Sequence, residues 1–152
     1  MKLNLSSQIV LNKVPVEYYR PQTAVDRSEL TRREKINTDI FASIEEGAKS
    51  IANSIEAEIK DKQREGRYCV LGVGTGLSLT PVFQELIRKY KEEKLSFKNV
   101  VVFNAYEYFP LTKDNKNSSI AQLKERFLDH VDIDPQNVFS PDGTISQDSV
   151  QE

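Results

Sequence analysis

The sequence contains few of the residues that build metal centres or disulfide scaffolds. It has one cysteine, Cys69, which excludes an internal disulfide and a cysteine-based metal cluster. It also has one histidine, His130, which argues against a histidine-rich metal site. We expect no bound metal, a small buried side chain at Cys69 within a strand, and a capping or packing role for His130 near a helix end.

Long hydrophobic runs and an excess of one charge are also missing. No apolar run approaches the ~20 residues that cross a bilayer, and no signal-peptide core follows Met1. The formal net charge is −2 over 152 residues, so no broad field attracts nucleic acid or an anionic membrane. We therefore expect a cytoplasmic protein whose partners include neither nucleic acid nor a membrane, and any anion must bind at a local site.

The N-terminal residues 1–36 show no clear hydrophobic period. Pro15 and Pro21, with two tyrosines between them, favour an arm laid over a surface instead of a strand in a sheet. The predicted organisation is therefore an arm over residues 1–36 and an α/β domain over residues 37–152.

From about Asn37 the apolar residues recur at three- and four-residue steps, which predicts a long amphipathic helix with one apolar stripe. Thr38 or Asp39 is a candidate N-cap for this helix, and Gly66 follows its charged end. The stripe comprises Ile40, Ile44, Ala48, Ile51, Ala52, Ile55 and Ile59.

Three further segments follow the order strand, helix, strand. Residues 67–72 form a short β-rich run that ends in glycine, residues 80–90 have a helical apolar period, and residues 99–104 are almost continuously apolar. The last run is typical of strands buried on both faces. Together the three segments predict a βαβ unit in a parallel sheet, with a right-handed crossover.

The remaining segments extend the same pattern. A helix capped by Asn117 or Ser118, a short strand at 138–139 and a helical start at 146–152 are predicted. The predicted fold class is therefore α/β, a Rossmann-like parallel sheet with flanking helices. Because such sheets usually have more strands, we expect this chain to be the N-terminal portion of a longer domain, with apolar sheet and helix faces left uncovered.

The first candidate site is the glycine-rich loop at residues 72–81, which leaves a strand and enters a helix. Its three glycines let the backbone approach a ligand closely, and free N–H groups at the helix start favour a phosphate. The alternative is a glycine turn with no ligand. The glycine spacing differs from the dinucleotide G-x-G-x-x-G pattern and no P-loop lysine is present, but spacing alone does not select a sugar phosphate over a nucleotide.

The second candidate site follows the next strand and consists of Asn104, Tyr106 and Glu107. Neighbouring parallel strands end at the same edge of a sheet, so we expect these residues beside the glycine loop. A carboxylate there can act as a base or hold a sugar hydroxyl. The alternative is that Tyr106 only packs and Glu107 is solvated.

Three segments, in this order, resemble the glucosamine-6-phosphate deaminase (isomerase) family, which also includes 6-phosphogluconolactonases. Residues 70–78 resemble the phosphate loop of that family. Residues 95–108 look like its S-F-K-[NH]-V-x-x-F-N-x-D-E-Y segment, and residues 127–133 are similar to its F-x-D-H-V-D-I segment. The resemblance covers roughly residues 35–143, and its second and third segments are the specific ones.

The resemblance implies a domain that binds a hexose 6-phosphate. The family converts glucosamine 6-phosphate to fructose 6-phosphate and ammonia without a metal or organic cofactor, and its members are commonly oligomers. The implied partners are therefore a hexose 6-phosphate and either further copies of the chain or the C-terminal remainder of the same polypeptide. Asn104 would contact the sugar. The residues implied to face the phosphate are Gly74, Thr75, Gly76, Leu77 and Ser78.

Two departures from the family pattern concern catalysis. Tyr106 stands where the family has the aspartate that moves a proton between C1 and C2 of the sugar, although Glu107 is kept. A phenol with an ordinary pKa of about 10 is a poor base at neutral pH, and Glu107 substitutes for the aspartate only if it turns towards the ligand. The family segment with the ring-opening histidine is also absent. We therefore expect impaired or absent catalysis in this chain.

Two other functions stay open. One is a non-catalytic regulatory or scaffolding module of a larger protein, in which the glycine loop serves only as a turn. The other is a nucleotide-binding Rossmann half, which the glycine spacing disfavours.

Overall fold

The computed structural model describes residues 23–32, 38–145 and 149. The chain divides into two units, Met1–Ser43 and Ile44–Glu152. The arm predicted over residues 1–36 lies mostly outside the described residues, and so does the boundary predicted after residue 36. Among the helices of the described segments, none has the length and apolar character of a membrane span.

The first unit contains helix α1 (Ala24–Thr31), which we did not predict from the sequence. Its start is a capping box. The Thr23 hydroxyl accepts a hydrogen bond from the Asp26 amide at 3.1 Å, and the Asp26 carboxylate accepts one from the Thr23 amide at 3.2 Å. The Thr-x-x-Asp spacing was the local signal for this helix.

The second unit begins with the long helix α2 (Ile44–Arg64). It starts later than predicted, at Ile44, so Thr38 and Asp39 do not occupy its N-cap position. Its buried face is narrower than the predicted stripe, because Ile40, Ile44 and Ile51 are exposed. The residues that face the core are Ala48, Ala52, Ile55 and Ile59.

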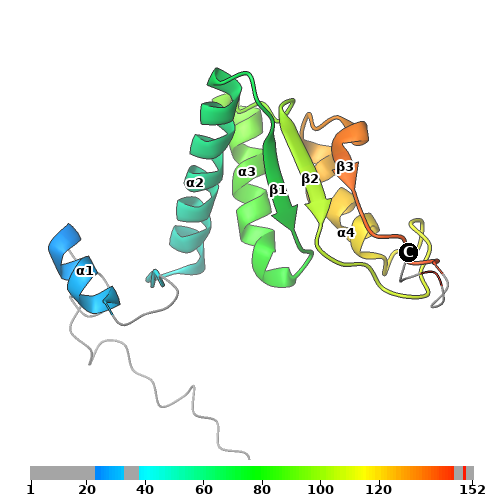
Figure 1. Cartoon of the computed structure of the whole chain (residues 1–152), viewed down its shortest axis with the longest axis horizontal. Helices are drawn as coiled ribbons and strands as arrows, with labels where there is room; N and C mark the ends of the chain where they lie inside the picture. The colour runs from blue at the N-terminus through cyan, green and yellow to red at the C-terminus, as the bar shows by residue number, and fades with distance from the viewer. Residues whose placement is uncertain (1–22, 33–37, 146–148, 150–152) are drawn as a thin grey trace, which may run out of the picture. The chain divides into compact units, whose positions relative to one another are not determined.

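The sheet is parallel and three-stranded, in the order β1–β2–β3 (Figure 1). The predicted βαβ unit and the short third strand are confirmed, with ends that shift by up to three residues. The helical start predicted at residues 146–152 lies outside the described residues apart from Ser149. The elements are β1 (Cys69–Val73), α3 (Thr80–Glu93), β2 (Val100–Asn104), α4 (Ser119–Arg126) and β3 (Val138–Phe139), with short 3₁₀ turns η4 (Leu77–Leu79), η5 (Leu128–His130) and η6 (Pro135–Asn137).

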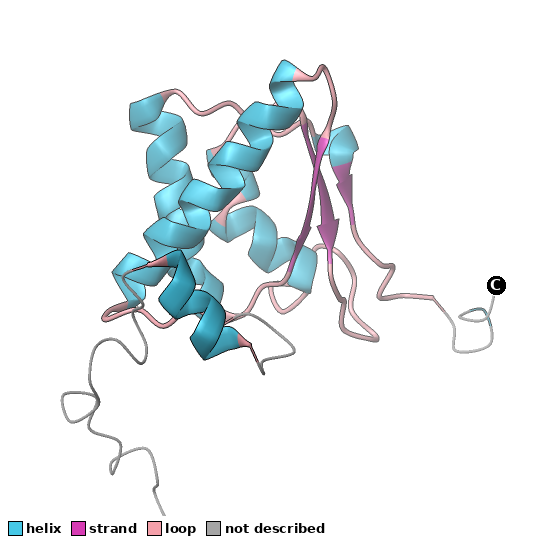
Figure 2. Ribbon diagram, turned by 60° about the vertical axis from the view of Figure 1, so that its left-hand side comes forward, coloured by secondary structure: helices cyan, strands magenta, loops and turns pink. Residues whose placement is uncertain are grey.

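Helices α2, α3 and α4 cover one face of the sheet (Figure 2). Both crossovers step in the same direction across the sheet, so right-handed connections put their helices on the same side. Three phenylalanines fill the space between these helices and the strands. Phe127 stacks on Phe83 with ring centroids 5.0 Å apart and meets the edge of Phe97 at 5.7 Å.

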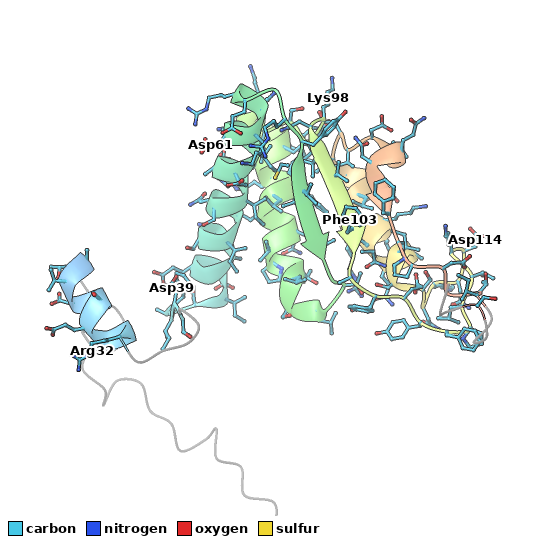
Figure 3. All side chains as sticks on the ribbon, viewed as in Figure 1. Arg32, Asp39, Asp61, Lys98, Phe103 and Asp114 are labelled. Atoms are coloured by element: carbon cyan, nitrogen blue, oxygen red, sulfur yellow. The ribbon has the colours of Figure 1, made fainter. Side chains whose placement is uncertain are left out.

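The opposite face of the sheet is apolar and exposed. Val70 is 61% exposed, and Phe103 and Phe139 are 47% and 48% exposed. Phe103, labelled in Figure 3, stacks on Phe139 of the next strand with centroids 5.0 Å apart. The strands are therefore not buried on both faces within the described residues, and the expectation of an uncovered sheet face is met.

The loop between α3 and β2 is tied to the segment after α4 by Asp132. Its carboxylate accepts hydrogen bonds from the Phe97 amide at 2.6 Å and from the Ser96 hydroxyl at 2.9 Å. Together with the contact between Phe97 and Phe127, these bonds join two of the segments singled out in the sequence. Both segments therefore have a structural role in holding the end of α3 against the end of α4.

Two helices end in a left-handed residue, and only one of these residues is glycine. Gly66 has φ +65° and closes α2 with a Schellman motif, in which the Arg67 amide reaches the Lys62 carbonyl at 2.9 Å. Lys94 has φ 58° at the end of α3, where the Leu95 amide reaches the Lys89 carbonyl at 3.2 Å. A side chain in this conformation crowds its own backbone, so Lys94 carries a strain that Gly66 avoids.

We predict opposite stability changes at these two positions. Gly66→Ala should lower the free energy of unfolding by about 1 kcal/mol, since an added Cβ meets no neighbour within 4 Å and only the positive φ resists it. Lys94→Gly should raise the free energy of unfolding by about 0.5 kcal/mol. Urea unfolding followed by circular dichroism measures both, and a loss of stability in Lys94→Gly would contradict the prediction.

Candidate functional site

The glycine loop and the end of β2 lie side by side at the carboxyl edge of the sheet. Val73 pairs with Asn104, and the Ala105 amide donates to the Val73 carbonyl at 2.7 Å. The loop then turns through η4 into α3. Thr75 is buried, whereas the three residues after it are exposed. The loop therefore has a fixed base next to β2 and an exposed tip at the start of a helix.

Tyr106 lies directly on the base of this loop. Its phenol oxygen is 2.8 Å from the hydroxyl oxygen of Thr75 and accepts a hydrogen bond from the Thr75 amide at 3.3 Å. A Cβ added at Gly74 would lie 3.3 Å from Cε1 of Tyr106, so glycine is the residue that leaves the ring room there. Tyr106 therefore occupies the amide and the hydroxyl of Thr75, which were expected to face a ligand.

A chain of buried hydrogen bonds continues from Thr75 to β2. The Thr75 hydroxyl is 3.1 Å from the Ser119 hydroxyl, which donates to Oδ1 of Asn104 at 3.1 Å. Asn104 in turn donates through Nδ2 to the Ser140 hydroxyl at 3.0 Å. Thr75, Asn104 and Ser119 are each at most 5% exposed. The loop, the end of β2 and the start of α4 are thus held by one polar network.

The partners in this network fix the direction of its protons. Nδ2 of Asn104 also donates to the Tyr106 carbonyl at 2.8 Å, which can only accept, so Oδ1 faces Ser119. Because Ser119 donates to Asn104, its oxygen accepts from Thr75. The Thr75 oxygen then accepts from Tyr106. Tyr106 is therefore the proton donor at the end of this series of hydrogen bonds.

This order of donors decides the charge of Tyr106. Hydrogen bonds with the hydroxyl and the amide of Thr75 act to lower the pKa of the Tyr106 phenol below its ordinary value of 10.0. The Thr75 hydroxyl can lower the pKa of Tyr106 only by donating its proton to the phenolate. In the proton order given above, the Thr75 hydroxyl donates this proton to Ser119 instead. We infer that Tyr106 stays protonated at neutral pH and acts as a donor, not as a base.

Glu107 points to the start of α4 instead of the glycine loop. Its carboxylate accepts hydrogen bonds from the amides of Ser119 at 2.6 Å and Ile120 at 3.1 Å, and from the Ser118 hydroxyl at 2.8 Å. It also accepts one from the Tyr108 amide at 2.9 Å. Burial alone would raise the pKa of Glu107, but these hydrogen bonds hold it below the ordinary value. Glu107 thus stabilises the positive end of a helix and is not merely solvated.

The structure therefore brings together some of the predicted site residues and separates others. Thr75, Asn104 and Tyr106 share one network, and Gly74 lies under the tyrosine ring. Gly76, Leu77 and Ser78 form the exposed tip of the loop, with Leu77 77% exposed.

Three residues of this region were missed in the sequence. Ser119 links the two candidate sites, Ser140 holds Asn104, and Nη1 of Arg126 donates to the Thr75 carbonyl at 2.8 Å. Ser119 follows the predicted cap Ser118, which was a signal that hydroxyls gather at this helix start. Nothing in the local pattern pointed to Arg126, because its contact with Thr75 joins residues far apart in the sequence.

The two rare residues fill the roles predicted for them. Cys69 is buried in β1, and burial raises the pKa of its thiol. Nε2 of His130 lies 2.9 Å from the Glu125 carbonyl near the end of α4, so the ring caps this end of the helix.

The role of Glu107 predicts a specific dependence of stability on pH. Glu107→Gln should lower the free energy of unfolding at pH 7 by about 1–2 kcal/mol, because a neutral amide loses the charge-assisted bonds to α4. The folded pKa of Glu107 lies below 4.5, so its contribution is present above pH 4.5 and is lost as the pH falls through the folded pKa. Stability of the variant should therefore fall less steeply below pH 4.5.

The matched control is Glu125→Gln, which changes an exposed carboxylate on the same helix. Chemical unfolding of both variants at several pH values between 3 and 7 separates the two sites. Equal effects of the two substitutions at pH 7 would contradict the role given to Glu107.

Comparison with known proteins identifies relatives of this chain. A family model described as glucosamine-6-phosphate isomerases/6-phosphogluconolactonase matches residues 42–152. A glucosamine-6-phosphate deaminase-like protein of Bacteroides thetaiotaomicron is 58% identical over all 152 residues, which correspond to 23% of its own length. The glucosamine-6-phosphate deaminase of Corynebacterium glutamicum (strain R) is 45% identical over 73 residues, 48% of this chain and 29% of that protein.

Two solved structures are also similar to this chain. A monomeric glucosamine-6-phosphate deaminase is 32% identical with a TM-score of 0.64, over 69% of this chain and 42% of its own. A 6-phosphogluconolactonase of Thermotoga maritima, 19% identical with a TM-score of 0.54 over 66% of this chain and 44% of its own, shares the fold. The chain therefore spans less than half the length of these relatives. It belongs to the family of glucosamine-6-phosphate isomerases and 6-phosphogluconolactonases.

Proposed function

We propose that this chain is a deaminase-like domain of amino-sugar metabolism that binds a hexose 6-phosphate and has impaired or absent catalysis. Family membership supports the ligand class, since two of the relatives named above are glucosamine-6-phosphate deaminases. The observation that carries the proposal is the position of the glycine loop at the carboxyl edge of the sheet, beside the end of β2. Ligands of open α/β sheets bind at this edge.

The exposed tip of the loop is the proposed phosphate site. Of the five residues predicted to face the phosphate, Gly76, Leu77 and Ser78 form this tip, whereas Gly74 and Thr75 lie at the base of the loop beside Tyr106. The tip leads through η4 into α3. The Leu79 amide donates to the Gly76 carbonyl at 3.0 Å, the Thr80 amide donates to the Leu77 carbonyl, and Pro81 has no amide proton, so the proposed anion binds at the first amides of η4 and not at those of α3. Asn104 is proposed to contact the sugar. In the structure its side chain is hydrogen-bonded to Ser119, Ser140 and the Tyr106 carbonyl.

The proposal of weak catalysis rests on Tyr106 and Glu107. Tyr106, at the position of the family base, has its phenol proton engaged with Thr75, and a neutral phenol does not remove a proton from a sugar carbon. Glu107 accepts hydrogen bonds from Ser118, Ser119 and Ile120 at the start of α4 and one from the Tyr108 amide, so its use as a base requires it to leave the helix start. A catalytic role for either residue stays a prediction, and so does the cytoplasmic location.

A direct test measures both parts of this proposal. Glucosamine 6-phosphate at millimolar concentration should raise the melting temperature of the chain, because a ligand that binds only the folded state stabilises it. The same mixture should release no ammonia or fructose 6-phosphate at rates of roughly 1–1000 per second, which are ordinary for enzymes. Glucosamine without phosphate is the control ligand. Turnover in that range would contradict impaired catalysis, and no stabilisation would contradict binding.

A non-catalytic scaffolding module is the second candidate function. The contact between Tyr106 and Thr75 favours it, since the tyrosine already fills hydrogen-bonding groups of the loop. In this case hexose phosphates, NAD and ATP should all leave the melting temperature unchanged. Stabilisation by NAD or ATP alone would instead favour a nucleotide-binding domain.

We also propose that the isolated chain associates with itself through the exposed face of the sheet. Val70, Phe103 and Phe139 present an apolar surface there, and the sheets of α/β proteins are normally covered on both faces. In a purified sample, the same face of a second copy is the surface available to cover it.

Light scattering at high protein concentration tests this association. The chain should have a mass above that of a monomer, and Phe103→Ser should shift it towards the monomer. Ile51→Ser removes an apolar side chain that is 46% exposed on α2, away from the sheet face, and should leave the mass unchanged. A monomeric wild-type chain would rule out self-association.

A further inference from the structure

The contact between Tyr106 and Thr75 has the geometry of a bound ligand. The phenol oxygen accepts the Thr75 amide at 3.3 Å and donates to the Thr75 hydroxyl oxygen at 2.8 Å. The ring lies against Gly74 and not in the core, since Tyr106 is 37% exposed. One side-chain group therefore uses both the donor and the acceptor that Thr75 presents at the edge of the sheet.

The order of proton donors in the network determines which chemical group can bind to the amide and the hydroxyl of Thr75. The Thr75 hydroxyl proton points to Ser119, because Ser119 donates to Asn104. Thr75 therefore offers its ligand one N–H donor and one oxygen acceptor. An O–H group satisfies both, whereas a fully ionised phosphate oxygen has no proton for the oxygen of Thr75.

We propose that the Tyr106 hydroxyl stands in for a sugar hydroxyl of the ligand and competes with it for Thr75. The inference rests on the proposed binding of a hexose 6-phosphate. The ligand binds after the tyrosine side chain swings away from Gly74, and one of its hydroxyls then takes the two bonds to Thr75. The phosphate group binds at the exposed tip of the loop, away from Thr75.

The surroundings of Tyr106 allow the side chain to move while its main chain stays. Asn104 holds the Tyr106 carbonyl at 2.8 Å, so the backbone is fixed next to β2. The ring packs edge-on against Tyr108, which is itself 50% exposed, with centroids 5.6 Å apart. Movement of the side chain therefore breaks two hydrogen bonds to Thr75 and disturbs no buried aromatic contact.

Thr75 itself stays in place when Tyr106 leaves. Its carbonyl is held by Arg126 at 2.8 Å, and its hydroxyl keeps its bond to Ser119. The hydroxyl oxygen and the amide of Thr75 are therefore preorganised for a ligand. They are accessible to it only when the Tyr106 side chain has moved away. The apparent affinity for the ligand is lowered by the fraction of molecules in which Tyr106 is bound to Thr75.

Binding measurements on Tyr106 variants test this competition. Tyr106→Phe keeps the ring but removes both hydrogen bonds, so it should bind glucosamine 6-phosphate about fivefold more tightly, the ratio that corresponds to one net hydrogen bond. Tyr106→Ala also removes the ring and should bind at least as tightly as Tyr106→Phe. Inorganic phosphate should gain less than about twofold in either variant, because its site is the loop tip.

The measurement is isothermal titration calorimetry with glucosamine 6-phosphate and with inorganic phosphate, and circular dichroism verifies that each variant is folded. Tyr68→Phe is the matched control, since Tyr68 is 61% exposed and precedes β1 at the other end of the strand. The competition is overturned if the wild type and the Tyr106 variants bind the sugar phosphate equally, or if inorganic phosphate gains as much as the sugar phosphate. If no variant binds the sugar phosphate at all, the proposed function fails together with it.

Discussion

The hydrogen-bond chain from Thr75 through Ser119 to Asn104 is the interaction on which the geometry of the candidate site depends. It joins the loop after β1, the end of β2 and the first residue of α4, and it is buried throughout. Buried hydroxyls and amides are costly unless they are paired, so each member fixes the orientation of the next. The base of the loop is consequently held by buried hydrogen bonds, whereas its tip at Gly76, Leu77 and Ser78 is exposed.

Glu107 and Tyr106 are adjacent in sequence, yet they serve different parts of this arrangement. Glu107 holds the start of α4 and so keeps Ser119 in place, whereas Tyr106 closes the chain of hydroxyls at the loop. The observed contacts of Glu107 therefore give it a structural role at the start of α4. Tyr106 gives this end of the hydrogen-bond series a neutral group that both donates and accepts, where the family resemblance implies an aspartate.

The sequence predicted the fold better than it predicted contacts between side chains. The apolar run at 99–104 and the glycine that ends residues 67–72 were sufficient for a parallel βαβ unit, since strand and helix periods are local properties. The start of α2 was misplaced because its apolar period continues backwards through Ile40, which lies outside the helix. The contacts of Arg126 and Ser119 with Thr75 could not be predicted, because they join residues far apart in the sequence and arise only when the chain folds.

The central claim is that the glycine loop binds a hexose 6-phosphate. Titration of the ¹⁵N-labelled chain with glucosamine 6-phosphate, followed by amide chemical shifts, tests it most directly. We expect saturable shifts that are largest at Thr75, Gly76 and Ser78, with a smaller change at Ala105, whose amide is bonded to the end of β1. Unchanged spectra at millimolar ligand, or shifts centred on another part of the fold, would contradict the account.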